Sequence, residues 1–230
     1  MQKYGEPMIK ENPLLIVMLT YNDLTVENAY EIFDKYKDSK AEYWGFKEEP
    51  LPLPEMKKLY SYMKSCGKKT ALEVVAYTQE ECLKGAKMAV ECGCDFLMGT
   101  IYSDEINILC KENNIKYLPF VGKIHDRPSV LEGSCLEMSH EAREYLDRGV
   151  YGIDLLGYRY TGNPAELNEE LVAAIDGPVC LAGSINSISR LDEVKKAAPW
   201  AFTIGSAFFD QKFGEDFGEQ IDKVCEYMKK

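Results

Sequence analysis

The sequence predicts an α/β fold, a closed barrel of eight parallel strands with helices around it, known as a (β/α)8 or TIM barrel. Eight short apolar segments recur along the 230 residues, and helical patterns separate most of them. Strands that alternate with helices form parallel sheets, and about 250 residues are typical of eight such units. We therefore expect one barrel domain over residues 1–230, with an open doubly wound sheet as the alternative.

The expected strands are apolar on both faces, as parallel strands are when helices cover them. In chain order they are PLLIVMLTY (13–21), AEYWGFK (41–47), TALEVVAY (70–77), CDFLMGTIY (94–102), KYLPFVGK (116–123), VYGIDLLGY (150–158), PVCLAGSI (178–185) and AFTIGSAFF (201–209).

Six segments have helical spacing of apolar residues, at 24–40, 78–93, 139–149, 163–177, 187–198 and 214–230. Thr25 is expected to cap the first helix. Gly93, Gly149 and Gly177 stand where helices should stop.

The composition excludes several classes of partner. Hydrophobic residues make up 46% of the chain and the apolar runs are too short to span a bilayer, so we expect no membrane partner. The net charge of −11 opposes attraction to nucleic-acid phosphates. A small-molecule substrate therefore fits best.

The N-terminal segment MQKYGEPMIKENP lacks a secretory pattern, so we expect a cytoplasmic protein. The eight cysteines are scattered without paired C-x-x-C motifs, which favours reduced structural thiols over a zinc site. With only His125 and His140 besides, we expect no metal site and no cofactor.

A polar segment containing Pro and Gly, at 124–136, follows the fifth expected strand. In a barrel it would lie on the face where the strands end. Long loops there often close over substrates, so one interpretation is a mobile lid. The other is a solvated connection that does not move.

Two successive strands end in the same small pair, Gly183-Ser184 and Gly205-Ser206. Glycine lets the backbone approach an anion closely and present N–H groups, and the serine hydroxyl adds a donor. In (β/α)8 barrels the loops after strands seven and eight, with a short extra helix, often form a phosphate site. The repeat predicts shared phosphate binding, with purely structural turns as the alternative.

The segment from Val150 to Phe209 resembles the ribulose-phosphate-binding barrel superfamily, through GIDLLGYRYTGNP, PVCLAGSINSISRLDEV and AFTIGSAFFD. This superfamily includes N-acylmannosamine-6-phosphate 2-epimerases and the sugar-phosphate isomerases of the histidine and tryptophan pathways. The resemblance implies a phosphorylated sugar or related metabolite as substrate. A homodimer is also consistent with it, since dimers are frequent among similar barrels.

The chain departs from these families at their reactive residues. Ala182 stands where the epimerases carry an acid-base glutamate, and ALEVVAYTQEE replaces the Asp-x-Lys-x-x-Asp motif of the sugar-phosphate decarboxylases. The first expected strand has no acid before Asp23, unlike that of the histidine-pathway isomerase. Fold analogy therefore does not name the reaction.

Isomerisation or epimerisation of a phosphosugar needs a base beside a carbonyl, an acid, and stabilisation of the enediolate oxygen. Glu73 and Asp154 interrupt apolar strands, where a charge is costly unless it is paired or functional. Lys47 and Lys123 end two other strands and could reach the same mouth. These four are the catalytic candidates, although ion pairing alone would also explain them.

Two further side chains are candidates for substrate binding. Arg159 follows the sixth strand and could hold an anionic group in its guanidinium fork, while His125 lies on the expected lid. The leading hypothesis is an isomerase or epimerase that transfers protons without a metal. The alternatives are a lyase or decarboxylase, including Schiff-base aldol chemistry on Lys123 or Lys47, and a phosphometabolite sensor without catalysis.

Overall fold

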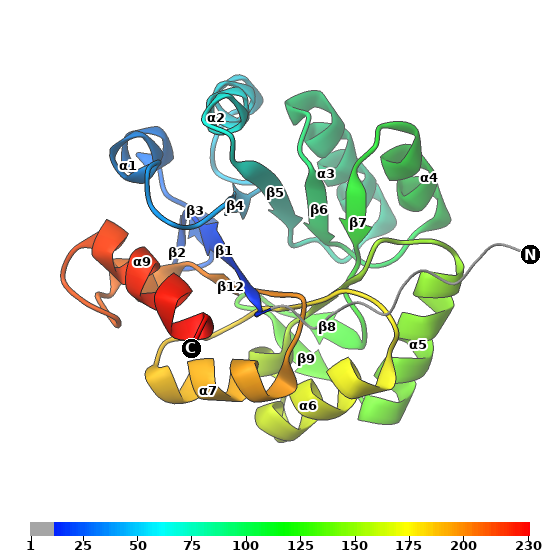
Figure 1. Ribbon diagram of the computed structural model, residues 1–230. Coiled ribbons are helices and arrows are strands. Elements are labelled where there is room, and N and C mark those ends of the chain that lie inside the picture. The colour runs from blue at the N-terminus through cyan, green and yellow to red at the C-terminus, as the bar shows by residue number, and fades with distance from the viewer. Residues whose placement is uncertain (1–11) are drawn as a thin grey trace, which may run out of the picture.

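The computed structural model describes residues 12–230, in which eight parallel strands form a barrel with helices around it (Figure 1). The strand order is β10-β11-β12-β1-β4-β5-β6-β7. The ring closes between β7 and β10, where Phe120 pairs with Asp154 and the Asp154 N–H donates to the Pro119 carbonyl at 3.0 Å. The predicted (β/α)8 barrel is confirmed, and the open sheet is excluded.

Each expected strand segment overlaps one barrel strand. The barrel strands are β1 (Leu14–Met18), β4 (Tyr43–Lys47), β5 (Lys69–Val74), β6 (Phe96–Gly99), β7 (Lys116–Leu118), β10 (Ile153–Leu155), β11 (Val179–Leu181) and β12 (Ala201–Ile204). Two antiparallel hairpins add β2 (Thr20–Tyr21) with β3 (Leu24–Thr25), and β8 (Lys123–His125) with β9 (Val130–Glu132).

Helices occupy the six expected segments and the two remaining intervals between barrel strands. They are α1 (Ala29–Tyr36), α2 (Leu53–Ser65), α3 (Gln79–Cys92), α4 (Asp104–Glu112), α5 (Cys135–Asp147), α6 (Pro164–Ala174), α7 (Ile188–Ala197), α8 (Ser206–Phe209) and α9 (Phe217–Met228), with a 3-10 turn at Gly157–Arg159. Gly93 ends α3 in the left-handed conformation, as expected, whereas α6 ends at Ala174, before Gly177.

The predicted cap at Thr25 is wrong. Thr25 lies in β3, where its hydroxyl donates to the Lys47 carbonyl at 2.8 Å and accepts from the Lys47 N–H at 2.9 Å. The chain turns back at Asn22 and Asp23, with φ of 49° and 69°, before the helix begins at Ala29. This hydroxyl therefore ties the β2–β3 hairpin to β4.

An apolar cluster fills the barrel interior toward the amino ends of the strands and closes that end. Its buried members are Ile16, Met18, Ala71, Phe96, Met98, Leu118, Cys180 and Ala201. Trp200 lies at this end with its ring 5.4 Å from that of Phe96 and 5.5 Å from that of Tyr151, and the Lys116 ammonium lies 4.5 Å from the Tyr151 ring. A ligand would therefore enter from the carboxyl ends.

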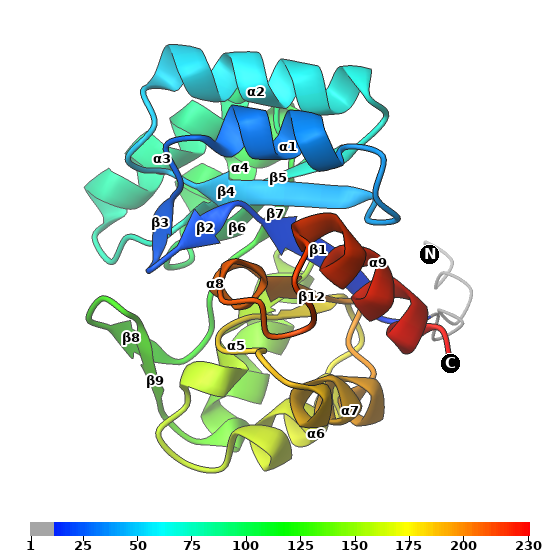
Figure 2. The ribbon, with the colours of Figure 1, turned by 90° about the vertical axis from the view of Figure 1, so that its left-hand side faces the viewer.

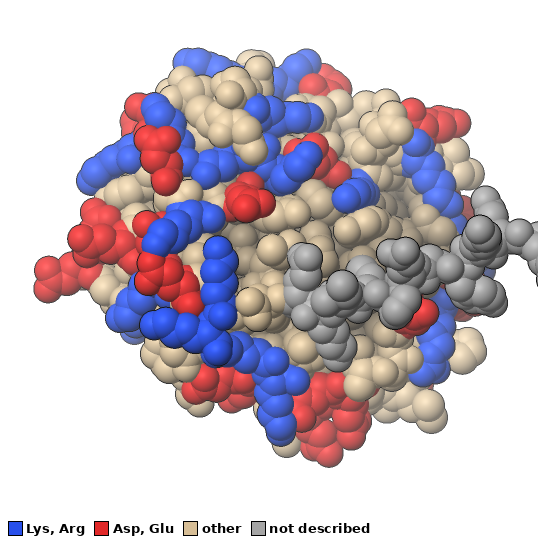
Figure 3. Space-filling model, viewed as in Figure 1, with Lys and Arg blue, Asp and Glu red and all other residues tan. Residues whose placement is uncertain are grey.

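The two ends of the barrel differ in what surrounds them. Around the amino ends of the strands, cationic and anionic side chains intermingle on the visible surface (Figure 3). Both hairpins lie at the opposite, carboxyl end (Figure 2).

No helix within residues 12–230 combines the length and apolar character needed to cross a membrane.

Candidate active site

A pocket of about 230 Å³ opens at the carboxyl ends of the barrel strands. Seven of the residues singled out from the sequence line it, namely Lys47, Glu73, Arg159, Gly183, Ser184, Gly205 and Ser206. Six polar lining residues were not among the predicted site residues: Thr20, Asp23, Ser129, Asn186, Thr203 and Asp210. The barrel thus brings together residues from both halves of the chain.

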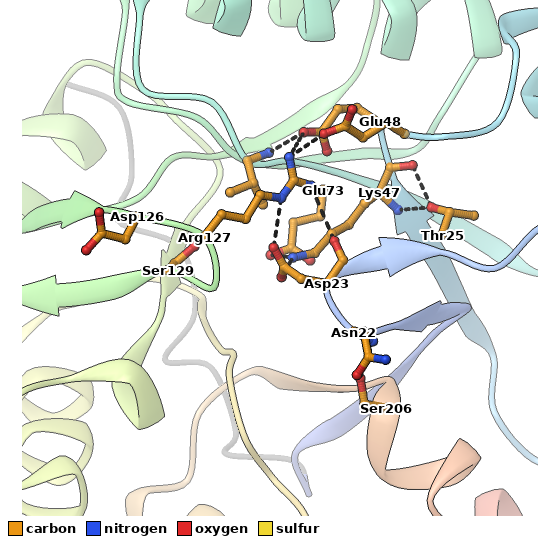
Figure 4. A network of polar contacts seen from close by, with 12 residues as sticks. Asn22, Asp23, Thr25, Lys47, Glu48, Glu73, Asp126, Arg127, Ser129 and Ser206 are labelled. Carbon is orange, nitrogen blue, oxygen red and sulfur yellow. Dashed lines mark hydrogen bonds and ion pairs between the residues drawn. The ribbon is translucent and has the colours of Figure 1, made fainter.

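The two Gly-Ser turns lie on one side of this pocket. Gly183 has a φ of 108°, which favours glycine. At Gly205 a Cβ atom would lie 2.4 Å from the Thr20 hydroxyl oxygen, so only glycine fits between β12 and β2. Ser206 begins α8, the short helix after β12, and its hydroxyl accepts from the Asn22 N–H at 3.2 Å (Figure 4).

Lys47 and Glu73 form an ion pair on the opposite side. They are register partners at the ends of β4 and β5, with 3.8 Å between the Lys47 Nζ and a Glu73 carboxylate oxygen. Both side chains are more than nine-tenths buried. Burial lowers the pKa of Lys47, but the carboxylates of Glu73 and Asp23 outweigh it and raise this pKa above its ordinary value. The lysine is therefore an ammonium ion.

Asp23 is the third member of this group, and its carboxylate accepts a hydrogen bond from the Lys47 ammonium (Figure 4). Burial alone would raise the pKa of Asp23, but Lys47 and Arg127 together hold it below its ordinary value. The sequence signal for Asp23 is the Asn-Asp pair directly after the first strand, which is typical of a two-residue hairpin turn.

Asp154 lies within the barrel and does not line the pocket. Its side chain is fully buried, and neither carboxyl oxygen has a hydrogen-bond partner within residues 12–230. Burial, together with the charge of Glu73, raises the pKa of Asp154 well above its ordinary value, although Lys47 opposes this effect. Burial therefore favours the neutral carboxylic acid form of Asp154 over the carboxylate.

The structure does not bring Lys123 or His125 to the pocket. The fifth barrel strand ends at Leu118, and both residues lie beyond it on β8. The Lys123 side chain is 75% exposed and its Nζ lies 3.4 Å from Glu132, while His125 lies 3.0 Å from Asp126. Neither residue lines the pocket.

Arg159 and Ala182 line the pocket next to Gly183. Within residues 12–230 Arg159 has neither an acidic partner nor a hydrogen bond from its side chain, so its guanidinium is available to a ligand. The position held by the acid-base glutamate in the epimerases is occupied by Ala182, which is 2% exposed. Asp23 and Glu73 instead lie on the side of β1, β4 and β5, and Asp210 follows α8.

Solved structures with the same fold are numerous, although no protein-family model and no curated protein matches the chain. Orotidine 5'-phosphate decarboxylase from Pyrococcus horikoshii matches with a TM-score of 0.71 and 14% identity, over 94% of this chain and 100% of that chain. N-acetylmannosamine-6-phosphate 2-epimerase from Clostridium perfringens matches with a TM-score of 0.62 and 13% identity, over 90% and 93%.

N-(5'-phosphoribosyl)anthranilate isomerase from Pyrococcus furiosus has a TM-score of 0.63 and 14% identity, over 94% of this chain and 98% of that chain. The chain therefore has the fold of these barrels, as the sequence resemblance implied. Identities of this size establish the fold and leave the reaction to be argued from the site.

Proposed function

We propose that this protein is a cytoplasmic enzyme that isomerises or epimerises a phosphorylated sugar or a closely related metabolite by proton transfer. One observation carries the proposal: a single pocket holds two Gly-Ser turns on one side and a buried Lys47–Glu73 ion pair on the other. The eight cysteines are all free thiols, which agrees with a reducing compartment.

The phosphate would bind between the two Gly-Ser turns. Ser184 is exposed to the pocket and makes no hydrogen bond within residues 12–230, and Ser206 is the first residue of α8, where backbone N–H groups lack helical partners. Arg159, beside Gly183, adds a forked cationic donor. Names of fold neighbours such as orotidine 5'-phosphate decarboxylase also refer to phosphorylated compounds.

The proton transfer would take place at the other end of the substrate. Glu73 is the base that removes the proton beside the carbonyl group, and the protonated Glu73 then returns a proton to a carbon of the enediolate. The Lys47 ammonium donates to the oxygen on which negative charge develops, and Asp23 holds that ammonium in place. Burial and the charge of Glu73 raise the pKa of Asp154, which lies within the barrel, and so favour its neutral form.

The size of the pocket limits the substrate. Pockets for drug-sized ligands have about 300–1,000 Å³, and this one has about 230 Å³. A single phosphorylated sugar with a short carbon chain fits this volume better than a nucleotide. The hydroxyl groups of the sugar would form hydrogen bonds with the Asp23 carboxylate, the Thr203 hydroxyl and the Asn186 amide.

Exchange of substrate protons with deuterated water tests this proposal. The protein is incubated in D2O with a panel of aldose and ketose 5- and 6-phosphates, and deuterium on the carbon beside the carbonyl is measured by mass spectrometry. We expect exchange with at least one compound, and a loss of about 100-fold or more in Glu73→Gln. Glu91→Gln, on the outer face of α3, is the matched control and should exchange normally.

Two results would contradict the proposal. Full exchange in Glu73→Gln would remove Glu73 as the base. Binding of phosphosugars without any exchange would instead support a sensor without catalysis. Schiff-base chemistry requires a neutral Lys47, which its two carboxylate neighbours oppose, so borohydride should trap no substrate adduct on Lys47.

A further inference from the structure

The β8–β9 hairpin connects one side of the barrel mouth to the other. It leaves the barrel after β7, and its tip at Asp126 to Ser129 reaches the turn between β2 and β3 and the end of β4 (Figures 2 and 4). Ser129 of this tip lines the pocket. The hairpin therefore forms part of the wall of the proposed active site.

Arg127 holds the tip in this position. Its Nε donates to an Asp23 carboxylate oxygen at 2.9 Å, and a terminal nitrogen donates to the Asp23 carbonyl at 3.3 Å. Another nitrogen lies 3.6 Å from Glu48 and donates to Glu49. The Arg127 side chain is 31% exposed, so water can compete for these contacts.

Tyr77 supplies a second attachment for the tip. Its hydroxyl donates to the Asp126 carbonyl at 2.8 Å and lies 2.8 Å from the Ser129 hydroxyl. These attachments are hydrogen bonds and ion pairs at the surface. From Asp126 to Ser129 the tip buries no apolar side chain, whereas Leu131, nearer the base, is fully buried.

The base of the hairpin is built differently. Gly122 and Gly133 flank it with φ of 80° and 121°, conformations that glycine adopts without strain. The Leu131 carbonyl accepts from the Thr161 N–H at 3.0 Å, and the Tyr160 hydroxyl donates to the Gly133 carbonyl at 2.9 Å. An anchored base with glycines at both ends and a polar tip is the construction of a hinged element.

The position of the tip also changes the charges that the substrate meets. Without Arg127, Lys47 would be the one cation within ion-pair distance of any of the four acidic side chains at this part of the mouth, those of Asp23, Glu48, Glu49 and Glu73, within residues 12–230. Arg127 adds a second cation and takes one oxygen of Asp23, while the Lys47 ammonium takes the other. The two cations thereby fix the orientation of the Asp23 carboxylate between them.

We propose that the β8–β9 hairpin is a hinged lid and that Arg127 at its tip is a positioning residue, which orients Asp23 against Lys47 when the lid closes. The inference rests on the proposed function only in treating this pocket as the active site. Closure would exclude water from the Lys47–Glu73 pair during proton transfer. Arg127 acts through Asp23 and touches no reacting atom.

Hydrogen exchange in the ligand-free protein tests the lid. Breaking the Arg127 contacts in Arg127→Gln should make the amides of residues 123–132 exchange about tenfold faster. Arg127→Lys should restore part of the protection, because a lysine can still pair with Asp23. Arg148→Gln is the matched control, since Arg148 pairs with Asp104 and Glu144 on the outer helices and should leave the hairpin unchanged.

Titration of the Asp23 carboxyl carbon by NMR tests the positioning role. The pKa of Asp23 should rise in Arg127→Gln, because one of the two cations that lower it is gone, and should stay unchanged in Arg148→Gln. Tyr77→Phe should loosen the hairpin without removing a cation from Asp23.

Unchanged exchange of residues 123–132 in Arg127→Gln would overturn the lid, and an unchanged Asp23 titration would overturn the positioning role. Neither measurement uses a phosphosugar. A protein that turned over no phosphosugar would therefore contradict the proposed function and leave this test of the hairpin intact.

Discussion

Replacing Asp154 by asparagine should raise the free energy of unfolding relative to the wild type, and this difference should grow as the pH rises. The carboxyl group is fully buried with no hydrogen-bond partner within residues 12–230, and its pKa lies well above the ordinary value of 3.8. Asparagine has nearly the same shape and no charge. The variant therefore removes the ionisation and leaves the packing of the barrel interior almost unchanged.

The sign and size follow from proton linkage. Below pH 3.8 the group is protonated in both folded and unfolded chains and contributes no pH dependence. Above 3.8 the unfolded chain loses the proton while the folded protein keeps it, so folding takes up a proton. The free energy of unfolding then falls by about 1.4 kcal/mol per pH unit until the pH reaches the folded-state pKa of Asp154.

Urea unfolding gives the free energies of unfolding of the wild type and Asp154→Asn at about pH 5 and about pH 6. Between these two pH values the free energy of the wild type should fall by about 1.4 kcal/mol relative to that of the variant. Any cost of unpaired amide hydrogens in the variant is independent of pH and cancels in the comparison. Asp176→Asn, in the exposed loop after α6, is the control. Its free energy of unfolding should change with pH as that of the wild type does. If the free energies of unfolding of the wild type and Asp154→Asn differed by the same amount at both pH values, the raised pKa of Asp154 would be refuted.

Three further substitutions probe the pocket. Lys47→Met should lower the free energy of unfolding by about 3–5 kcal/mol near neutral pH, because it leaves the buried Glu73 carboxylate without a cation and Asp23 with Arg127 alone, and the loss measured by urea unfolding should shrink in acid. Gly205→Ala should cost about 1–3 kcal/mol in the same assay, since its Cβ would lie 2.4 Å from the Thr20 hydroxyl. Asp210→Asn should strengthen the binding of inorganic phosphate a few-fold in calorimetric titration, because an exposed like charge leaves the rim of the pocket. No loss of stability in the first two variants, or weaker phosphate binding in the third, would contradict these assignments.

The residues that could be predicted are those whose signal is local to a strand. Lys47 and Glu73 stood out because each places a charge at an apolar strand. The Gly-Ser pairs stood out because they repeat at strand ends. A parallel barrel brings all carboxyl ends to one mouth, so the fold alone was enough to bring these residues into one pocket.

The residues that were missed depend on turns and on distant contacts. Asp23 reaches Lys47 because the chain reverses at Asn22 and Asp23, and Arg127 meets Asp23 across the mouth although 104 positions separate them. Lys123 was placed at a strand end, but its strand stops at Leu118 and the chain continues into a hairpin. Strand limits and hairpin geometry depend on tertiary contacts that periodicity does not encode.

Calorimetric titration with inorganic phosphate tests the central claim, that the two Gly-Ser turns bind one phosphate group. The wild type should bind phosphate at a single site. Ser184→Asp combined with Ser206→Asp should abolish that binding, because each change places a carboxylate at the proposed phosphate position. Ser189→Asp, exposed on α7, should bind as the wild type does. Absence of phosphate binding in the wild type, or unchanged binding in the double variant, would contradict the account.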